Sequence, residues 1–338
     1  MSVRTDPATE VRRRRATPPR AVWGGAAIVV VLVLAYLLSA GQPYLATVVA
    51  GAAVYATAAT GLDFVVGWLR EVSVGQGAAM LVGAYCGVPF LEAGVLVAGL
   101  VAAVAGLVTG LVLGLAAVRV KGFALATYTL IVALAVELVF TSVPALGGGV
   151  GRPVIADSVV GIPLDTTTTA MLCVVVAILG VLLHARLRRS MTGLAWRGVG
   201  LNPSAAGSVA VSPVGARLAA FGLAGVYAGV AGFLFALVSG YLAPTVFGFE
   251  LAVLMLAMVV IGGRGRSLGA VVGAVVFTVY QQVAPASAYS DAAIGVVLMV
   301  VVWFAPAGIV PYVGTGLRRA RRRWWPGSPG GMGKELVA

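Results

Sequence analysis

The sequence predicts an all-α protein that crosses a membrane many times as one helical bundle. Of its 338 residues, 60% are hydrophobic and only 10% are charged, and the mean hydropathy is +1.04. A soluble domain carries about 25% charged residues, so a chain this apolar cannot present a water-compatible surface. Apolar runs long enough to cross a bilayer recur along the chain, which predicts about eight to ten spans, some of them short or broken.

The apolar runs give the spans in chain order. A basic segment at residues 1–20 contains three prolines and is expected to be disordered. The bundle is assigned to residues 21–313, and a basic tail follows at residues 314–338. The expected spans are 22–40, 44–62, 77–91, 93–118, 122–142, 169–184, 215–239, 250–262, 270–285 and 291–312.

Residues 61–77 interrupt this pattern. They are rich in glycine and carry three charges, Asp63, Arg70 and Glu71, beside apolar sequence. Non-helical backbone at membrane depth is tolerated only where protein surrounds it, so the stretch predicts a broken helix or a re-entrant turn. Carboxylates in such a place need a partner, and Arg70 is the nearest candidate.

A weak internal repeat accompanies the short spans. Ser73-Val-Gly75 and Ser267-Leu-Gly269 each lie beside a short span, and each precedes a Gly-Ala pair. Five spans on either side of the loop at 143–168 would give two halves of opposite orientation, which is the inverted repeat of many transporters. Chance similarity in a chain with 46 glycines explains the repeat equally well.

Small residues spaced four apart predict tight packing between helices. Such spacing lets two helix backbones approach closely within a membrane. The pairs are Gly83 and Gly87, Gly106 and Gly110, Gly110 and Gly114, Gly225 and Gly229, and Gly269 and Gly273.

Lys and Arg are distributed unevenly over the expected loops. If ten spans alternate, one side of the membrane receives nearly all of them and the other receives only Arg152. Basic loops stay in the cytoplasm, so both termini and the polar loop 185–214 are expected on that side of the cell membrane. The Arg clusters at 12–15 and 318–323 then contact anionic lipid, because no soluble domain exists that would carry them to nucleic acid.

Residues that could carry catalysis are scarce. His184 is the only histidine and is expected at the membrane interface, at the end of a span. Cys86 and Cys173 lie in apolar runs without a metal-binding spacing. Ser73 lacks the first glycine of a nucleophile elbow. The sequence therefore predicts no enzyme activity, no metal site and no cofactor.

Polar residues inside the spans are candidates for a translocation pathway. A carboxylate in the membrane is costly, and a functional role is the default hypothesis for it. Glu137 is the deepest one, and structural and pathway roles are weighed equally for it. Asp63, Ser73 and Gln76 complete the set of candidates.

Several blocks of residues occur in the order and spacing of one known family. They are Gly61-Leu62-Asp63 through Gly67, Ser73-Val-Gly75 and Gly83-Ala-Tyr85; Lys121-Gly-Phe-Ala-Leu-Ala-Thr-Tyr-Thr-Leu130 with Glu137; Gly193, Arg197, Ala205-Ala206, Phe221 and Ala224-Gly225 through Gly232; Phe249-Glu250 through Gly263, Ser267, Gly269 and Gly273-Ala274; and Phe304-Ala-Pro306-Ala-Gly308. Over about residues 44–313 the chain resembles permease subunits of branched-chain amino acid ABC transporters, of the LivM type.

The resemblance implies a mechanism and a set of partners. Two permease subunits, usually unlike, would pair in the membrane, two cytoplasmic ATP-binding subunits would dock on their coupling loops, and an extracytoplasmic binding protein would deliver the solute. The permease itself would hydrolyse nothing. The implied solutes are branched-chain or related amino acids. Urea, amides or another small polar solute, and an ATP-independent transporter or channel, stay open as alternatives.

The loop 185–214 stands where the family has its coupling helix. The family's alternating charges after the position of Arg197 are missing, and Gly200, Leu201 and Pro203 stand there. Gly and Pro weaken a helix interior by about 1 and 3 kcal/mol, so a shorter helix is expected. The residues expected to contact an ATPase are Gly193, Trp196, Arg197, Leu201, Ala205 and Ala206.

Three further residues distinguish this chain. Asn202 is expected to cap a short helical turn from Pro203 to Ala210. Asp63 stands where the family usually has an amide, and Gln76 where it usually has a histidine.

Overall fold

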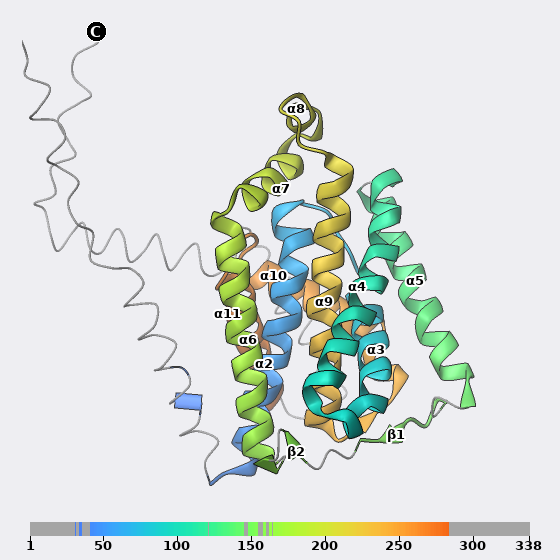
Figure 1. Ribbon diagram of the computed structural model, residues 1–338, viewed down its shortest axis with the longest axis vertical. Helices are drawn as coiled ribbons and strands as arrows, with labels where there is room; N and C mark the ends of the chain where they lie inside the picture. The colour runs from blue at the N-terminus through green and yellow to red at the C-terminus, as the bar shows by residue number, and fades with distance from the viewer. Residues whose placement is uncertain are drawn as a thin grey trace, which may run out of the picture.

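The computed structural model describes residues 41–283, apart from 121, 145–147, 155–157, 160–161 and 164, together with Val31, Leu34 and Ala35. Long helices run side by side, and a short helical hairpin, α7–α8, projects from one end (Figure 1). The helices are α2 (Pro43–Asp63), α3 (Gln76–Gly87), α4 (Val95–Arg119), α5 (Phe123–Ser142), α6 (Thr166–Arg189), α7 (Met191–Leu201), α8 (Pro203–Ser208), α9 (Pro213–Ser239), α10 (Phe249–Gly262) and α11 (Gly269–Val283).

Within this part of the chain a helix lies at each expected span, with limits that agree to within a few residues. Within the described residues, six helical segments are long and apolar enough to cross a membrane, while α3 and α11 are shorter. The protein is therefore a multi-pass helical membrane protein. The expected spans 22–40 and 291–312 and the basic segments 1–20 and 314–338 lie outside the described residues, except for Val31, Leu34 and Ala35.

A glycine seam joins α4 to α9 in antiparallel fashion. A Cβ added to Gly106 would overlap the carbonyl oxygen of Gly225, and one added to Gly225 would overlap that of Gly106. Gly229 meets the carbonyl of Ala102 in the same way, and on its other side Gly83 of α3 meets the backbone of Gly229. The spacing of small residues thus brings three helix backbones into direct contact, as the sequence predicts.

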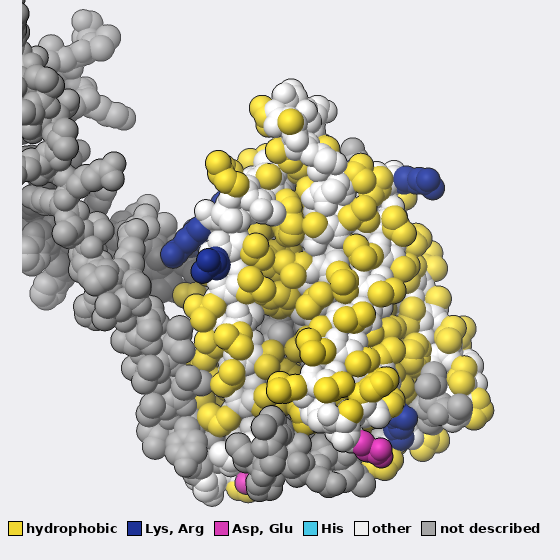
Figure 2. Space-filling model, in the orientation of Figure 1, with side chains coloured by type: hydrophobic (Ala, Val, Ile, Leu, Met, Phe, Trp, Pro, Cys, Tyr) yellow, Lys and Arg dark blue, Asp and Glu magenta, His cyan; other side chains and the backbone are white. Residues whose placement is uncertain are grey.

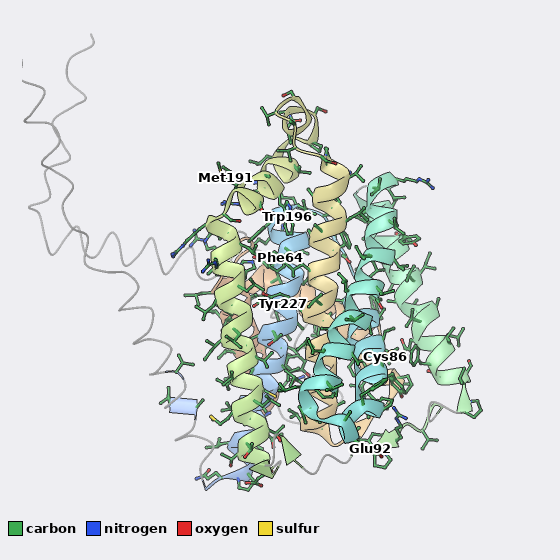
Figure 3. All side chains as sticks on the ribbon, viewed as in Figure 1. Phe64, Cys86, Glu92, Met191, Trp196 and Tyr227 are labelled. Atoms are coloured by element: carbon green, nitrogen blue, oxygen red, sulfur yellow. The ribbon has the colours of Figure 1, made fainter. Side chains whose placement is uncertain are left out.

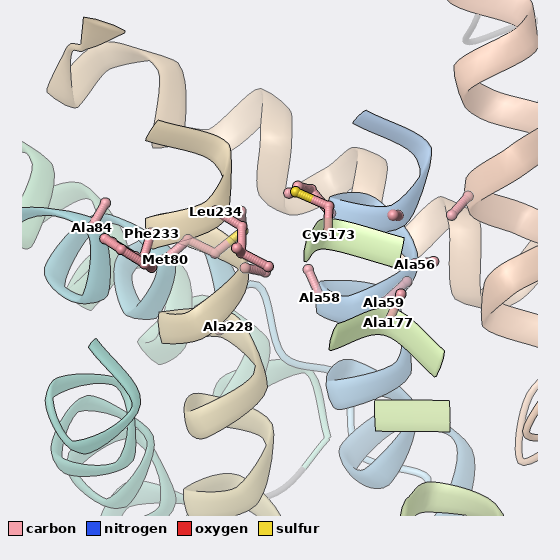
Figure 4. Close-up of a cluster of buried hydrophobic side chains, with 14 of the residues drawn as sticks. Ala56, Ala58, Ala59, Met80, Ala84, Cys173, Ala177, Ala228, Phe233 and Leu234 are labelled. Atoms are coloured by element: carbon pink, nitrogen blue, oxygen red, sulfur yellow. The ribbon is translucent and has the colours of Figure 1, made fainter. Parts of the chain in front are cut away.

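Small side chains also pack α2 against its neighbours. Ala58 and Ala59 of α2 lie beside Cys173 and Ala177 of α6, while Met80 and Phe233 fill the space between α3 and α9 (Figure 4). Alanine and glycine at these positions let the helices approach closely, and the larger side chains fill the remaining gaps.

Two short helices begin inside the bundle after non-helical segments. A π-helical turn, Phe64–Trp68, follows α2, and the non-helical residues 69–75 lead into α3. In the second half, β4 (Tyr241–Leu242) and a 3₁₀ turn (Pro244–Phe247) lead into α10. The predicted broken helix at 61–77 is therefore confirmed.

The sequence repeat does not correspond to this pair of interruptions. Ser73-Val-Gly75 precedes the short helix α3, whereas Ser267-Leu-Gly269 follows the short helix α10, in the turn to α11. The structural parallel is instead between residues 69–75 before α3 and residues 240–248 before α10.

Short strands lie at the end of the molecule opposite α7–α8 (Figure 1). β1 (Arg152–Pro153) pairs antiparallel with β4, and β2 (Ser158–Val159) pairs with β3 (Ile162–Pro163). The Arg152 guanidinium lies 5.6 Å from the ring centre of Tyr85. Between the two ends, apolar side chains cover most of the visible face, as the lipid-facing surface of a membrane protein requires (Figure 2).

Candidate functional site

Polar caps shape the α7–α8 hairpin. The Ser190 hydroxyl donates to the carbonyl of Leu187 (2.6 Å) and accepts from the amide of Gly193 (3.3 Å), which ends α6 and begins α7. Asn202 Oδ1 accepts from the amides of Ser204 and Ala205, both at 3.1 Å, and begins α8. The expected Asn202 cap is confirmed, although α8 ends at Ser208.

The side chains of this hairpin divide between the bundle and the surface. Trp196 and Ala206, expected to contact an ATPase, are buried in a cluster with Phe64, Trp68 and Tyr227. Figure 3 shows Trp196, Phe64 and Tyr227 in a column below Met191, between α6 and α9. Met191, Leu194 and Leu201 are instead exposed, together with Ala205.

Arg197 and Gly193 fix the junction between α6 and α7. Arg197 donates from Nε to the carbonyl of Gly193 and from Nη2 to the carbonyl of Arg188, both at 2.9 Å. A Cβ on Gly193 would overlap the carbonyl oxygen of Leu187. Arg197 therefore satisfies backbone carbonyls near the end of α6 and still has three N–H groups for a partner.

A hollow of about 660 Å³ lies between the hairpin and the π-helical turn. Its lining is mainly apolar and includes Trp68, Leu194, Leu201 and Val209, with Arg70 and Arg197 also contributing.

A buried carboxylate, that of Asp63, immediately precedes the π-helical turn. Asp63 Oδ2 is 3.1 Å from Nε2 of His184, and the side chains are 1% and 0% exposed. Asp63 Oδ1 accepts from the amide of Gly265, in the turn between α10 and α11, at 2.7 Å. The sequence placed His184 at the interface, but protein encloses it completely.

A second buried ion pair supports the non-helical segment before α3. The Nε of Arg217 on α9 lies 2.6 Å from Oε1 of Glu71. Arg70, the expected partner, is instead exposed and has a positive φ of 58°.

Further along this segment, hydrogen bonds fix the start of α3. Thr129 Oγ1 on α5 accepts from the amide of Val74 at 3.0 Å. Ser73 is buried and accepts from the amide of Gly75 at 3.4 Å. Gln76 Nε2 donates to the carbonyls of Ala58 and Ala224, at 3.3 and 3.1 Å. The first two bonds satisfy backbone amides of the non-helical segment, and the Gln76 side chain joins the start of α3 to α2 and α9.

The beginnings of α3 and α10 meet inside the bundle. A Cβ on Gly77 would overlap the carbonyl oxygen of Phe247, which immediately precedes the N-cap of α10. That N-cap, Gly248, faces Glu137: the carboxylate oxygens lie 2.9 and 3.2 Å from where a Gly248 Cβ would stand. A carboxylate is stabilised at a helix N-terminus by the helix dipole.

The pathway candidates thus fall into two places. Ser73, Gln76 and Glu137 lie around the starts of the two short helices, whereas Asp63 lies below the α7–α8 hairpin. Sequence reasoning missed His184, Thr129 and Arg217 as partners, because each lies on a different helix from the residue it serves. Within the described part of the chain, no three His, Cys, Asp or Glu side chains come together to hold a metal ion.

Comparisons with known proteins agree with this architecture. Residues 44–303 match the family described as the branched-chain amino acid transport system / permease component. Relatives from Salmonella typhimurium and Escherichia coli, each named high-affinity branched-chain amino acid transport system permease protein LivM, are 30% identical over 156 residues. The match covers 45% of this chain and 37% of each relative's length. No solved structure matches the chain.

Proposed function

Because this chain belongs to the family of branched-chain amino acid transport permease components, we propose that it is the membrane subunit of an ABC importer for branched-chain or related amino acids. It would pair with a second permease subunit, receive solute from an extracytoplasmic binding protein, and move it by using the work of two cytoplasmic ATP-binding subunits. The chain itself forms the path and carries out no hydrolysis.

The α7–α8 hairpin supports this proposal most directly. It projects from the bundle (Figure 1), and the side chains of Met191, Leu194 and Leu201 are exposed on its surface. Met and Arg are enriched at protein interfaces, and the core of an interface is apolar. The occupant of the neighbouring hollow should therefore present an apolar side chain with a carboxylate directed at Arg70 or Arg197.

The hairpin gives a direct test of ATPase docking. Leu201→Arg places a second charge beside Arg197 and removes an exposed apolar contact, without disturbing the buried Trp196 cluster. We expect recovery of the co-purifying ATP-binding subunits to fall about tenfold or more, as for an interface anchor, and leucine uptake to fall with it. Phe123→Arg, an equally drastic change at an exposed position on α5, is the control and should leave recovery unchanged. Equal recovery from both variants would exclude the hairpin as the docking site and favour an ATP-independent transporter.

The same proposal fixes the orientation of the chain. Arg119, Arg264 and the hairpin lie at one end of the bundle, since Gly114 of α4 packs on the first half of α9 and Gly265 lies against Gly67. The positive-inside rule places that end in the cytoplasm. In a chain without Cys86 and Cys173, an impermeant thiol reagent applied to intact cells should label Val150→Cys and spare Ser204→Cys, both exposed positions. The reverse labelling pattern would overturn this orientation.

The solute path is proposed to pass the starts of α3 and α10. Interrupted helices in transporters direct their N-termini at anionic groups of the substrate, and an amino acid has a carboxylate. The Glu137 carboxylate lies at the start of α10, and there it would bind the ammonium group of an amino acid.

Removing the Glu137 carboxylate tests this path. Glu137→Ala is expected to reduce leucine uptake severalfold with normal membrane expression. Glu250→Ala removes an exposed carboxylate from the first turn of α10, the helix whose N-cap Glu137 faces from α5, and should leave uptake unchanged. Unchanged uptake in Glu137→Ala would give Glu137 a structural role only. Parallel assays with urea and acetamide distinguish the alternative solutes.

A further inference from the structure

The Asp63–His184 pair joins three separate parts of the chain. Asp63 ends α2, His184 lies near the end of α6, and the amide bound by the second carboxylate oxygen belongs to Gly265 in the α10–α11 turn. A buried carboxylate without partners is strongly unfavourable, so these two contacts hold the three elements at one point.

Aromatic rings close the pair off from water. The His184 ring centre lies 4.7 Å from that of Phe64 and 4.9 Å from that of Trp68. Neither ring nitrogen of His184 makes a hydrogen bond among the described residues, and neither does Asp63 Oδ2, so His184 and Asp63 are joined by the 3.1 Å polar contact alone.

The α7 helix contacts this cluster through both a side chain and its backbone. The ring of Trp196 lies 6.1 Å from Phe64 and 5.9 Å from Trp68, centre to centre. A Cβ on Gly200 would overlap the carbonyl oxygen of Trp68. Because the backbone of α7 packs there directly on the backbone of the π-helical turn, with no side chain between them, a displacement of α7 must also displace the turn.

The turn between α10 and α11 is fitted equally closely. A Cβ on Gly67 would overlap both Asp63 Oδ1 and the amide nitrogen of Gly265. π-Helical turns are rare and are frequently found at functional sites. Here the turn brings the backbone of α2 against the α10–α11 turn, while residues 69–75 continue from it to α3.

We propose that Asp63 and His184 are positioning residues for transport. They hold the end of α6 and the π-helical turn against the α10–α11 turn. A displacement of α7 is thereby transmitted to α3 and α10 together. This inference rests on the proposed function, because it takes the α7–α8 hairpin as the place where ATP-driven motion enters. Asp63 and His184 contact no solute in this role.

An apolar replacement of the whole pair separates positioning from stability. Asp63→Leu alone leaves the Gly265 amide without its acceptor and the buried His184 without its carboxylate neighbour, and is expected to lower the unfolding temperature. The double variant Asp63→Leu/His184→Leu removes both polar side chains and is expected to recover much of that stability, since apolar pairs often replace buried ion pairs without loss. Asp63→Asn keeps an acceptor for Gly265 and a polar contact to His184, and is the conservative control.

The first measurement needs only the purified chain. Spin labels at the exposed positions Ser204 and Leu268 report the separation of the α7–α8 hairpin from the α10–α11 turn. We expect a narrow distance distribution in wild type and Asp63→Asn, and a broad one in the folded double variant. Equally narrow distributions in all three proteins would show that the Asp63–His184 pair does not hold the hairpin relative to the α10–α11 turn.

The second measurement uses the complex with its co-purifying ATP-binding subunits in proteoliposomes. The double variant should still hydrolyse ATP, while leucine transported per ATP falls about fivefold or more, the size of an allosteric coupling; Asp63→Asn should match wild type. A wild-type ratio in the double variant would overturn the positioning role. Failure of the wild-type chain to recover any ATP-binding subunit would instead overturn the proposed function and the positioning role with it. In that case the spin labels would still test whether the Asp63–His184 pair holds the hairpin relative to the α10–α11 turn.

Discussion

Gly225→Val is expected to prevent the bundle from assembling. The new side chain would overlap the carbonyl oxygen of Gly106, and its Cβ would stand 2.8 Å from the Cα of Gly110. These are backbone atoms of α4, so no rotamer change relieves the overlap and the two helices must separate. Overpacking a core costs about 1–3 kcal/mol when side chains can adjust, and more is expected here because the obstacle is backbone.

The measurement is the amount of monodisperse protein that elutes after detergent extraction. Gly225→Val should fall about tenfold or more below wild type, because native proteins have only about 5–15 kcal/mol of stability to lose. Gly99→Val is the matched control: it lies on α4, and its Cβ would meet only the Phe233 ring at 3.8 Å, an ordinary contact. Similar loss in both variants would show that helix propensity, and not the seam, limits assembly.

Arg217→Met is expected to destabilise the protein nearly as much. It leaves the Glu71 carboxylate, buried before α3, without the guanidinium that lies 2.6 Å away. Breaking a buried pair by removing one partner typically costs about 3–5 kcal/mol. The loss should appear as a lower midpoint of thermal unfolding in detergent.

Two further variants show whether the pair is the cause. Glu71→Gln combined with Arg217→Met removes both charges and should recover part of the midpoint, since the carboxylate that lost its guanidinium is then gone too. Arg70→Met removes a neighbouring exposed charge and should shift the midpoint little, because exposed charges contribute little to stability. A midpoint for the double variant as low as that of Arg217→Met would refute the pairing as the main source of stability.

Local features of this protein were predictable from its sequence. The helix limits follow from the apolar runs, the interruption after α2 from glycines and charges at 61–77, and the start of α8 from Asn202 before Pro203. Each depends on chemistry within a few residues of the position concerned. The glycine spacing on α4 and α9 likewise predicted close helix contact, although it did not say which helices meet.

The pairing of charges could not be predicted in this way. Arg70 is adjacent to Glu71 in sequence, yet Arg217, 146 residues further on, binds that carboxylate. The backbone turns at Arg70 with a φ of 58° and leaves its side chain exposed, while Arg217 enters the interior on α9. Proximity along the chain therefore gave the wrong partner.

What the sequence determined by itself is the membrane class, the order of the apolar helices, and the loop 185–214 that separates two of them. Only the tertiary structure decided which faces are internal: Trp196 and Ala206 face the bundle, Leu201 faces outward, and His184 lies enclosed against Asp63. The physical reason is that lipid is as apolar as a protein core, so hydrophobic periodicity, which separates inside from outside in a soluble helix, does not distinguish them within a membrane. There the inside is set by close packing between helices and by the pairing of the few polar groups.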